Sequence, residues 1–198
     1  MMMQVQEKRY YTPEEYLKLE VNSSQRHEYI DGEIIPMTGG TPNHNRIAGN
    51  FYAALNFALR GKPYDVFFAD QRLWVPRRKL YTYPDVMIVQ GELQFQEGRR
   101  DTITNPIMIA EVLSKSTEGY DRGEKFQAYR TIPTVEEYVL IDQYTLYVEQ
   151  FIRTESSKWL LTEYDGESAT LSLSSVQFEI VLANIYDKVD FEAEEQKA

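Results

Sequence analysis

Residues 107–113 read Ile107-Met108-Ile109-Ala110-Glu111-Val112-Leu113, an apolar run that contains a single acid. A short apolar run of this kind is typical of a buried strand. An unpaired carboxylate inside such a strand is costly, so Glu111 needs a cation, a base or an ion beside it. The alternative is that Glu111 faces solvent, but the apolar Val112 and Leu113 that follow it do not alternate cleanly with polar residues.

A second acid lies at the mouth of another apolar run, Tyr83-Pro84-Asp85-Val86-Met87-Ile88-Val89. If the two strands are adjacent and antiparallel, the start of one lies beside the end of the other. Asp85 and Glu111 would then meet at one edge of a sheet. Two close carboxylates repel each other, and a hard divalent cation such as Mg²⁺ relieves the repulsion. The alternative for Asp85 is a turn cap.

Helices are predicted on both sides of these strands. Thr12-Pro13-Glu14-Glu15 has the capping residue, the first-turn proline and the acid of a capping box, so a short helix is expected at 12–20. Apolar residues at helical spacing predict a second helix at 44–60, which Gly61 would end. A third helix is expected at 120–130.

Hairpins and further strands complete the predicted α/β (α+β) fold. An Asp31-Gly32 turn between 28–30 and 33–35 is a strong hairpin signal. Further hairpins are expected from 137–141 with 145–152, and from 158–164 with 169–173 around Asp165-Gly166. The remaining strands are expected at 65–69, 72–75, 85–89 and 107–113.

A cation is expected near Glu111 if the site acts on phosphate esters. Residues 111 and 113 share a face of the strand, and a metal-dependent nuclease often has a cation two residues after the acid, where it stabilises the anionic transition state. Here that position is Leu113. Lys125 on the following helix is a substitute that can reach back to the strand edge. The alternative is that Lys125 forms a helix-surface pair with Asp121.

The composition limits the class of protein. The chain has 198 residues, a net charge of −10 and a sequence pI of about 4.8, which argue against a broad electrostatic grip on nucleic acid. It has no cysteine, so disulfides, thiolate metal sites and a catalytic thiol are excluded. No apolar run or signal-like segment points to a membrane, so a cytoplasmic location is expected. We expect one domain over 1–186 and an acidic, flexible tail over 187–198.

An ordered series of motifs resembles a known family. The series comprises Tyr11-Thr12-Pro13-Glu14-Glu15-Tyr16, the stretch from Arg26 to Ile34, His44, Pro84-Asp85-Val86, Glu111 to Thr117, Asp121 with Lys125 and Tyr129, and Glu136 to Asp142. Together they resemble the Uma-two family of restriction-endonuclease-like proteins in the PD-(D/E)XK nuclease superfamily. The resemblance implies a mixed sheet flanked by helices and hydrolysis of DNA phosphodiesters with Mg²⁺, or with Mn²⁺ in its place. By analogy it also implies a homodimer.

The resemblance also assigns roles to residues. Asp85 and Glu111 match the two acids that hold the metal, and Lys125 would replace the lysine missing at position 113. An upstream acid, a further metal ligand, would be Glu33 or Glu28; Glu33 is preferred because it follows the turn within the stronger match.

His44 matches a family histidine at the start of the long helix. The positive helix N-terminus disfavours its protonation, so a neutral His44 would orient a phosphate or water. The alternative is a helix-entry residue without a role in chemistry.

Two functions from different classes therefore remain open. The first is a Mg²⁺-dependent DNA endonuclease, favoured by the intact set of Asp85, Glu111 and Lys125. The second is a non-catalytic interaction protein on the same fold, favoured by the acidic body and by Leu113. Two basic clusters, Arg77-Arg78-Lys79 and Arg99-Arg100, would offer local contacts to DNA phosphates, or else lie in ordinary solvated loops.

Overall fold

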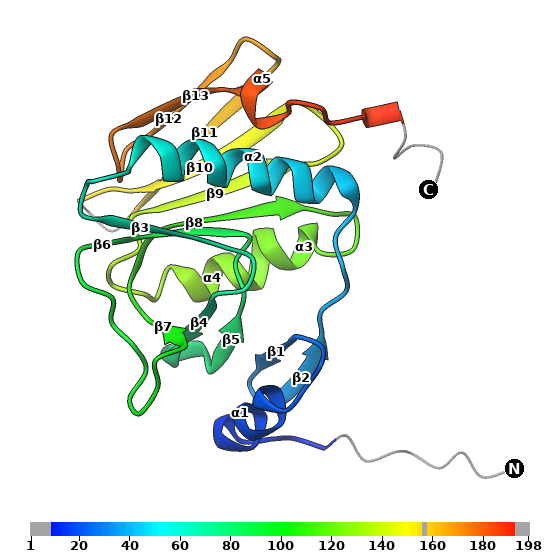
Figure 1. Cartoon of the computed structure of the whole chain (residues 1–198), viewed down its shortest axis with the longest axis vertical. Helices are drawn as coiled ribbons and strands as arrows, with labels where there is room; N and C mark the ends of the chain where they lie inside the picture. The colour runs from blue at the N-terminus through cyan, green and yellow to red at the C-terminus, as the bar shows by residue number, and fades with distance from the viewer. Residues whose placement is uncertain (1–8, 156–157, 193–198) are drawn as a thin grey trace, which may run out of the picture.

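A six-stranded mixed sheet forms the centre of the computed structural model, which describes residues 9–155 and 158–192 (Figure 1). The strand order is β11-β10-β9-β8-β6-β3, with β8 and β9 parallel and the other neighbours antiparallel. The bounds are β3 (Tyr64–Phe68), β6 (Val86–Gln90), β8 (Pro106–Leu113), β9 (Glu137–Asp142), β10 (Tyr147–Arg153) and β11 (Trp159–Asp165).

The two strands that carry the acids are neighbours. β6 and β8 run antiparallel with Val86 opposite Ala110, which puts Asp85 beside Glu111, as the sequence predicts. All eight residues of β8 are buried, because layers cover both faces of the sheet. The apolar run from Ile107 to Leu113 is thus a central strand.

Helices from different parts of the chain cover the two faces of the central sheet (Figure 1). On one face lie the helix α2 (Pro42–Ala58), the short helix α5 (Leu182–Ile185) and a two-stranded sheet of β12 (Thr170–Leu173) and β13 (Phe178–Val181). Their apolar residues share one core with Val112 of β8. Leu113, which points the other way, packs in a second core with Tyr129 of the following helical segment.

That helical segment contains a widened turn. α3 (Glu118–Tyr120), the π-helical turn η2 (Asp121–Lys125) and α4 (Phe126–Tyr129) follow one another without a break. The sequence predicts a helix at 120–130, and the structure adds the π turn, for which no sequence signal was recognised. Such turns are rare and are frequent at functional sites. Here the turn contains Asp121 and Lys125, and both are buried.

A second sheet lies below the first in Figure 1 and contains β1, which supplies a further acid. Its strand order is β2-β1-β5-β4-β7, with bounds β1 (His27–Ile30), β2 (Glu33–Pro36), β4 (Arg72–Val75), β5 (Leu80–Thr82) and β7 (Thr102–Ile103). The 3₁₀ turn η1 (Pro76–Arg78) joins β4 to β5. The predicted Asp31-Gly32 hairpin is present, and both turn residues have positive φ.

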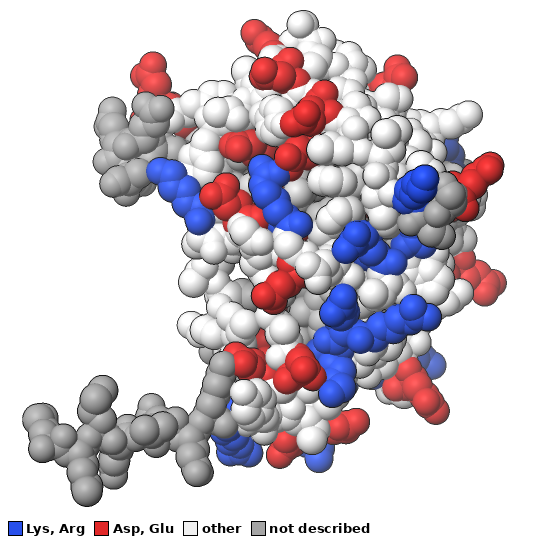
Figure 2. All heavy atoms as spheres, turned by 180° about the vertical axis from the view of Figure 1, so that it is seen from behind, with Lys and Arg blue, Asp and Glu red and all other residues white. Residues whose placement is uncertain are grey.

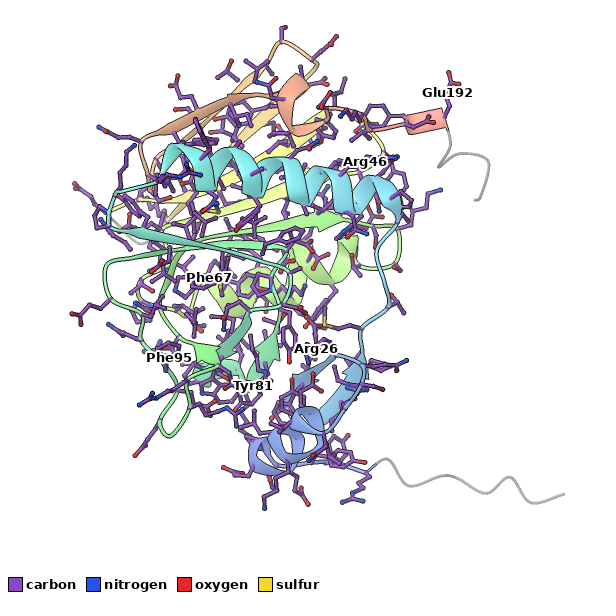
Figure 3. All side chains as sticks on the ribbon, viewed as in Figure 1. Arg26, Arg46, Phe67, Tyr81, Phe95 and Glu192 are labelled. Carbon is purple, nitrogen blue, oxygen red and sulfur yellow. The ribbon has the colours of Figure 1, made fainter. Side chains whose placement is uncertain are left out.

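Helix α1 (Pro13–Val21) packs on this second sheet through tyrosines. Its N-terminus has the predicted capping box between Thr12 and Glu15. Tyr16 is fully buried against Tyr29 and Tyr81, and Figure 3 shows Tyr81 in the lower part of the molecule. Aromatic packing therefore fixes the β1–β2 hairpin against the rest of the chain.

One predicted hairpin is wrong. β11 pairs along its whole length with β10, whereas β12 pairs with β13 in the separate small sheet. The Asp165-Gly166 turn is present, with a positive φ at Gly166, but it directs the chain to another layer. A local turn signal cannot show whether the next strand returns to the same sheet.

The C-terminal segment that was expected to be flexible from residue 187 contacts the rest of the protein as far as residue 191. Asn43 of α2 donates a hydrogen bond from Nδ2 to the carbonyl of Asp190 at 2.6 Å and accepts one from its N–H at 3.1 Å. Phe191 packs against Tyr186 with the upper core, and Figure 3 shows Glu192 beyond the end of α2 that carries Arg46. Backbone pairing and apolar contact hold residues 187–192 despite their acidity. The rest of the predicted tail, 193–198, lies outside the described residues.

Within the described residues, no helix combines the length and apolar character needed to cross a membrane.

Candidate active site

The carboxylates of Asp85 and Glu111 each accept a hydrogen bond from the backbone of the neighbouring strand at the sheet edge. The N–H of Asp85 donates to Oε2 of Glu111 at 3.3 Å, and the N–H of Val112 donates to Oδ2 of Asp85 at 2.8 Å. Glu111 is only 3% exposed, while the side chain of Asp85 keeps 20% of its surface open to solvent. The pair therefore has a buried member and a member that a ligand from solvent can reach.

Lys125 lies among carboxylates. Its Nζ is 3.1 Å from Oε1 of Glu111 and 3.0 Å from Oδ1 of Asp121. The hydroxyl of Tyr129 donates to the same Oε1 of Glu111 at 2.6 Å. The predicted reach from the helix back to the strand edge is therefore present in the structure.

The upstream acid that contacts this cluster directly is Glu28. Its Oε1 lies 3.6 Å from Nζ of Lys125 and accepts a hydrogen bond from the hydroxyl of Thr82. Glu33, the sequence preference, pairs with Ile30 at the far end of the same hairpin. The geometry favours Glu28 because β5 binds β1 and brings Thr82 beside it, a pairing that the sequence does not predict.

The cluster has more negative than positive charge. Glu28, Asp85, Glu111 and Asp121 meet only one permanent cation there, Lys125, among the described residues. Burial tends to lower the pKa of Lys125, but the acids outweigh it and raise that pKa well above its usual value, so the ammonium form persists.

The same imbalance acts on Glu111. Burial, together with Asp121 and Asp85, raises its pKa above the usual range, and Lys125 opposes them. Three donors, Lys125 Nζ, the Tyr129 hydroxyl and the Asp85 N–H, nevertheless point at its two oxygens, which favours the ionised carboxylate.

His44 lies on the solvent side of Asp85. Its Nε2 is 3.2 Å from Oδ2 of Asp85, and its backbone N–H is capped by Thr41. Burial lowers the pKa of His44, but contact with Asp85 and the charges of Glu111 and Asp121 raise it by more. The expectation of a neutral His44, based on the helix terminus alone, is therefore corrected: the acids favour protonation.

The carboxylate oxygens at this sheet edge are ligands of the kind that Mg²⁺ prefers. Mg²⁺ is usually held by one or two carboxylates and keeps several waters, and Asp85 with Glu111 supplies such a pair. No group of three or more histidine, aspartate or glutamate side chains in the described ranges is arranged to hold a metal without other ligands. Any ion at this pair would therefore need water or substrate to complete its coordination.

Asp121 and Tyr129 were noted in the motif series without a role. Asp121, Lys125 and Tyr129 are spaced four residues apart, which places them along one side of a helix. Their common spacing is the signal from which their grouping was predictable: Lys125 and Tyr129 contact Glu111, and Asp121 contacts Lys125.

Comparisons with known proteins show the family and the fold of this chain. The Uma2 family model, described as "Putative restriction endonuclease", matches residues 13–183. Two uncharacterized proteins of Synechocystis sp. are 42% and 32% identical, over 87% and 91% of this chain and 98% and 93% of their own lengths. A crystal structure from Anabaena variabilis, titled a "putative nuclease" of DUF820, has a TM-score of 0.73 at 17% identity and covers 89% of this chain and 97% of its own. That structure shares the fold, and the chain belongs to the Uma2 family of restriction-endonuclease-like proteins.

Proposed function

We propose that this protein is a metal-dependent endonuclease that hydrolyses DNA phosphodiesters at the edge formed by Asp85 and Glu111. The observation that carries the proposal is the buried excess of carboxylates around one lysine, with Asp85 open to solvent. A divalent cation would relieve this excess of charge. The family description and the shared nuclease fold support the same reading.

Mg²⁺, or Mn²⁺ in its place, would be held by Asp85 and Glu111. When bound, such an ion supplies Lewis acidity to a phosphate oxygen and an activated water. Glu28 is the proposed third acid of the site, in preference to Glu33, because it contacts Lys125 directly.

Lys125 is proposed to stabilise the negative charge that develops on the phosphate. Asp121 and Glu28 hold its ammonium group in place from two sides. His44, at the solvent side of Asp85, is placed to hold a phosphate oxygen or the attacking water.

Nicking of supercoiled plasmid DNA tests the proposal. We expect nicks with Mg²⁺ or Mn²⁺, none with EDTA, and none from Asp85→Asn. The variant Asp65→Asn is a matched control, because Asp65 is an exposed residue of β3 outside the cluster. Equal nicking by Asp85→Asn and wild type would show a contaminating nuclease and remove the proposal's support.

A non-catalytic interaction protein on the same fold is the second candidate. The net charge of −10 and the apolar Leu113 favour it. A wild-type protein that cuts neither single-stranded nor duplex DNA with either metal would make it the better reading. The homodimer stays a prediction from analogy, which sedimentation of the purified protein tests.

A further inference from the structure

A pocket of about 430 Å³ lies beside the carboxylate site. Its walls come from three places: the end of β1 and its turn (Ile30, Asp31), the η1 loop (residues 77–80) and the helical segment that carries Lys125 (Tyr120, Glu124, Gln127, Ala128). Pockets of this size bind small molecules or single monomer units of a polymer, and a DNA duplex is far too wide to enter one.

The pocket adjoins the cluster around Lys125. The ring of Tyr120 lines it, and the Nζ of Lys125 lies 5.4 Å from the centre of that ring. Ile30 also lines it and shares a face of β1 with Glu28, since alternate residues of a strand point the same way. The pocket and the carboxylate cluster are therefore neighbours that share Tyr120 and one face of β1.

Tyr120 has an unsatisfied polar group. Its hydroxyl oxygen is buried and has no hydrogen-bond partner among the described residues. Buried hydroxyl groups without a partner are uncommon and costly, so each calls for an explanation. The charged groups that act on this hydroxyl are those of the carboxylate cluster, with Glu28 and Lys125 first, so Tyr120 links the pocket to that cluster.

The charge of the pocket is opposite to that of the whole protein. Arg77, Arg78 and Lys79 line it against Asp31 and Glu124, on a chain with a net charge of −10. Lys79 is paired with Asp31 at 3.1 Å, which leaves the two arginines exposed on the rim. Figure 2 shows that Lys and Arg side chains gather on part of one face, with acids around them.

The walls of the pocket are fixed by backbone contacts. The N–H of Asp31 donates to the carbonyl of Lys79 at 3.1 Å. Both residues have left-handed backbones, with φ of 42° and 45°, although neither is glycine. Both values belong to turns, since Asp31 begins the Asp31-Gly32 hairpin turn and Lys79 ends η1, so these two turns set the shape of this wall of the pocket.

We propose that this basic pocket is a nucleotide subsite, which receives the phosphate and nucleoside of one unpaired nucleotide in the strand that is cut. The inference rests on the proposed function and adds a substrate class: DNA with an unpaired segment at the site. Arg77 and Arg78 bind the phosphate, and the apolar and aromatic lining, Ile30, Leu80 and Tyr120, contacts the nucleoside. An acidic body with one basic pocket can hold a few phosphates of a flexible strand but cannot follow a duplex.

Fluorescence anisotropy in EDTA tests the subsite without cleavage. The probe is a short fluorescein-labelled single-stranded oligodeoxynucleotide. We expect Arg77→Ala/Arg78→Ala to lose about tenfold in affinity and to reduce the salt dependence by about 0.7 per lost phosphate contact. The control Arg60→Ala/Lys62→Ala removes the same charge from exposed positions beyond α2, and we expect it to bind as the wild type does.

A variant that removes a negative charge from the pocket separates an effect of charge on binding from an effect of misfolding. Glu124 is exposed and lines the pocket, so Glu124→Gln removes a negative charge and is expected to tighten binding several-fold. A duplex of the same sequence is expected to bind more weakly than the single strand. Equal losses in both double variants, no gain from Glu124→Gln, or equal affinity for the duplex would each overturn the inference. Because no metal or cleavage is needed, the subsite can fail while the nuclease proposal stands, and the reverse also holds.

Discussion

Lys125 is the residue on which both the stability and the proposed chemistry depend. It is the only lysine or arginine within ion-pair distance of Glu111 in the described part of the chain, and it contacts Asp121 and Glu28 as well. A buried cation with three acidic partners cannot be removed without leaving uncompensated charge. The residue that is proposed to stabilise the transition state is therefore also one that stabilises the folded protein in the absence of substrate.

Lys125→Met is therefore expected to have two effects. DNA cleavage should fall on the order of a hundredfold or more, because a stabiliser of developing charge is lost. The melting temperature should fall too, since the acids lose their partner. Lys125→Arg keeps the charge and should recover more of the stability than of the activity. Wild-type cleavage by Lys125→Met would refute the assigned role.

Asp85→Asn should remove the response to metal. Mg²⁺ or Mn²⁺ that binds the native protein raises its melting temperature with concentration. We expect that rise in the wild type and in Asp65→Asn, measured by differential scanning fluorimetry, but not in Asp85→Asn. An equal rise in all three would place the ion elsewhere.

Asp101 gives the fold a contribution that acid removes. Its carboxylate accepts hydrogen bonds from Nε of Arg99 at 2.7 Å and from the hydroxyl of Thr102 at 3.1 Å. The hydrogen bonds from Arg99, more than any other contact, lower the pKa of Asp101 from 3.8 to about 2.

Because the folded pKa is below the unfolded one, the contribution of Asp101 is present above about pH 4 and is lost as the pH falls toward 2. Melting curves across this window should show that the stability difference between wild type and Asp101→Asn shrinks as the pH falls. A difference that stays constant would mean that Asp101 does not titrate as argued.

Elements with a clear local sequence signal were predictable, and short elements that depend on distant partners were not. The apolar pattern around Glu111 gave the central strand, and the signals at Thr12 and at Asp31-Gly32 gave α1 and the first hairpin. The missed strands β5, β7 and β13 have only two to four residues. Their pairing depends on distant partners, which a local pattern does not encode.

The site shows the same division. Asp85, Glu111 and Lys125 were predictable because each stands out against its own local sequence. The preference for Glu33 over Glu28 depended on a motif match, whereas the contact of Glu28 with Lys125 follows from the β1–β5 pairing, which the local sequence does not predict. The π turn at Asp121–Lys125 was not predicted. Over so few residues, the spacing of apolar side chains is nearly the same for an α-helix and for a helix with one π turn.

Glu137 joins two layers at the scale of elements. It begins β9, is fully buried and accepts hydrogen bonds from the N–H of Ser174 at 3.3 Å and from the N–H and hydroxyl of Ser175 at 3.0 and 2.6 Å. These serines lie in the turn between β12 and β13. A single carboxylate thus ties the small sheet to the central one.

Glu137→Ala should lower the free energy of unfolding by about 3 kcal/mol, since it leaves buried donors without an acceptor. The neighbouring Glu136→Ala is the matched control, because Glu136 is exposed. Urea unfolding followed by circular dichroism measures both. Equal midpoints for the two variants would mean that packing alone holds the small sheet.

At the scale of the whole molecule, net charge describes the surface poorly. The chain has a net charge of −10, yet three of its basic residues, Arg77, Arg78 and Lys79, line a pocket next to the carboxylate cluster. The acidity of 187–192 likewise suggested a free segment, while its backbone is bound by two asparagines of α2, Asn43 and Asn50. The position of the charged side chains and the hydrogen bonding of the backbone therefore describe these two regions better than the net charge does.

Truncation tests this view of the C-terminal segment. A chain that ends after Tyr186 loses the two hydrogen bonds between Asn43 and Asp190, the bond from Asn50 to the carbonyl of Asp187 at 2.9 Å, and the packing of Phe191 on Tyr186. With about 1 kcal/mol for each hydrogen bond, we expect its free energy of unfolding to fall by about 3 kcal/mol relative to a chain that ends after Glu192. The comparison of these two truncations isolates residues 187–192 from those beyond them. Identical urea midpoints would show that Asn43 and Asn50 bind this segment without stabilising the fold. The expectation from its acidity, that residues 187–192 are dispensable, would then hold.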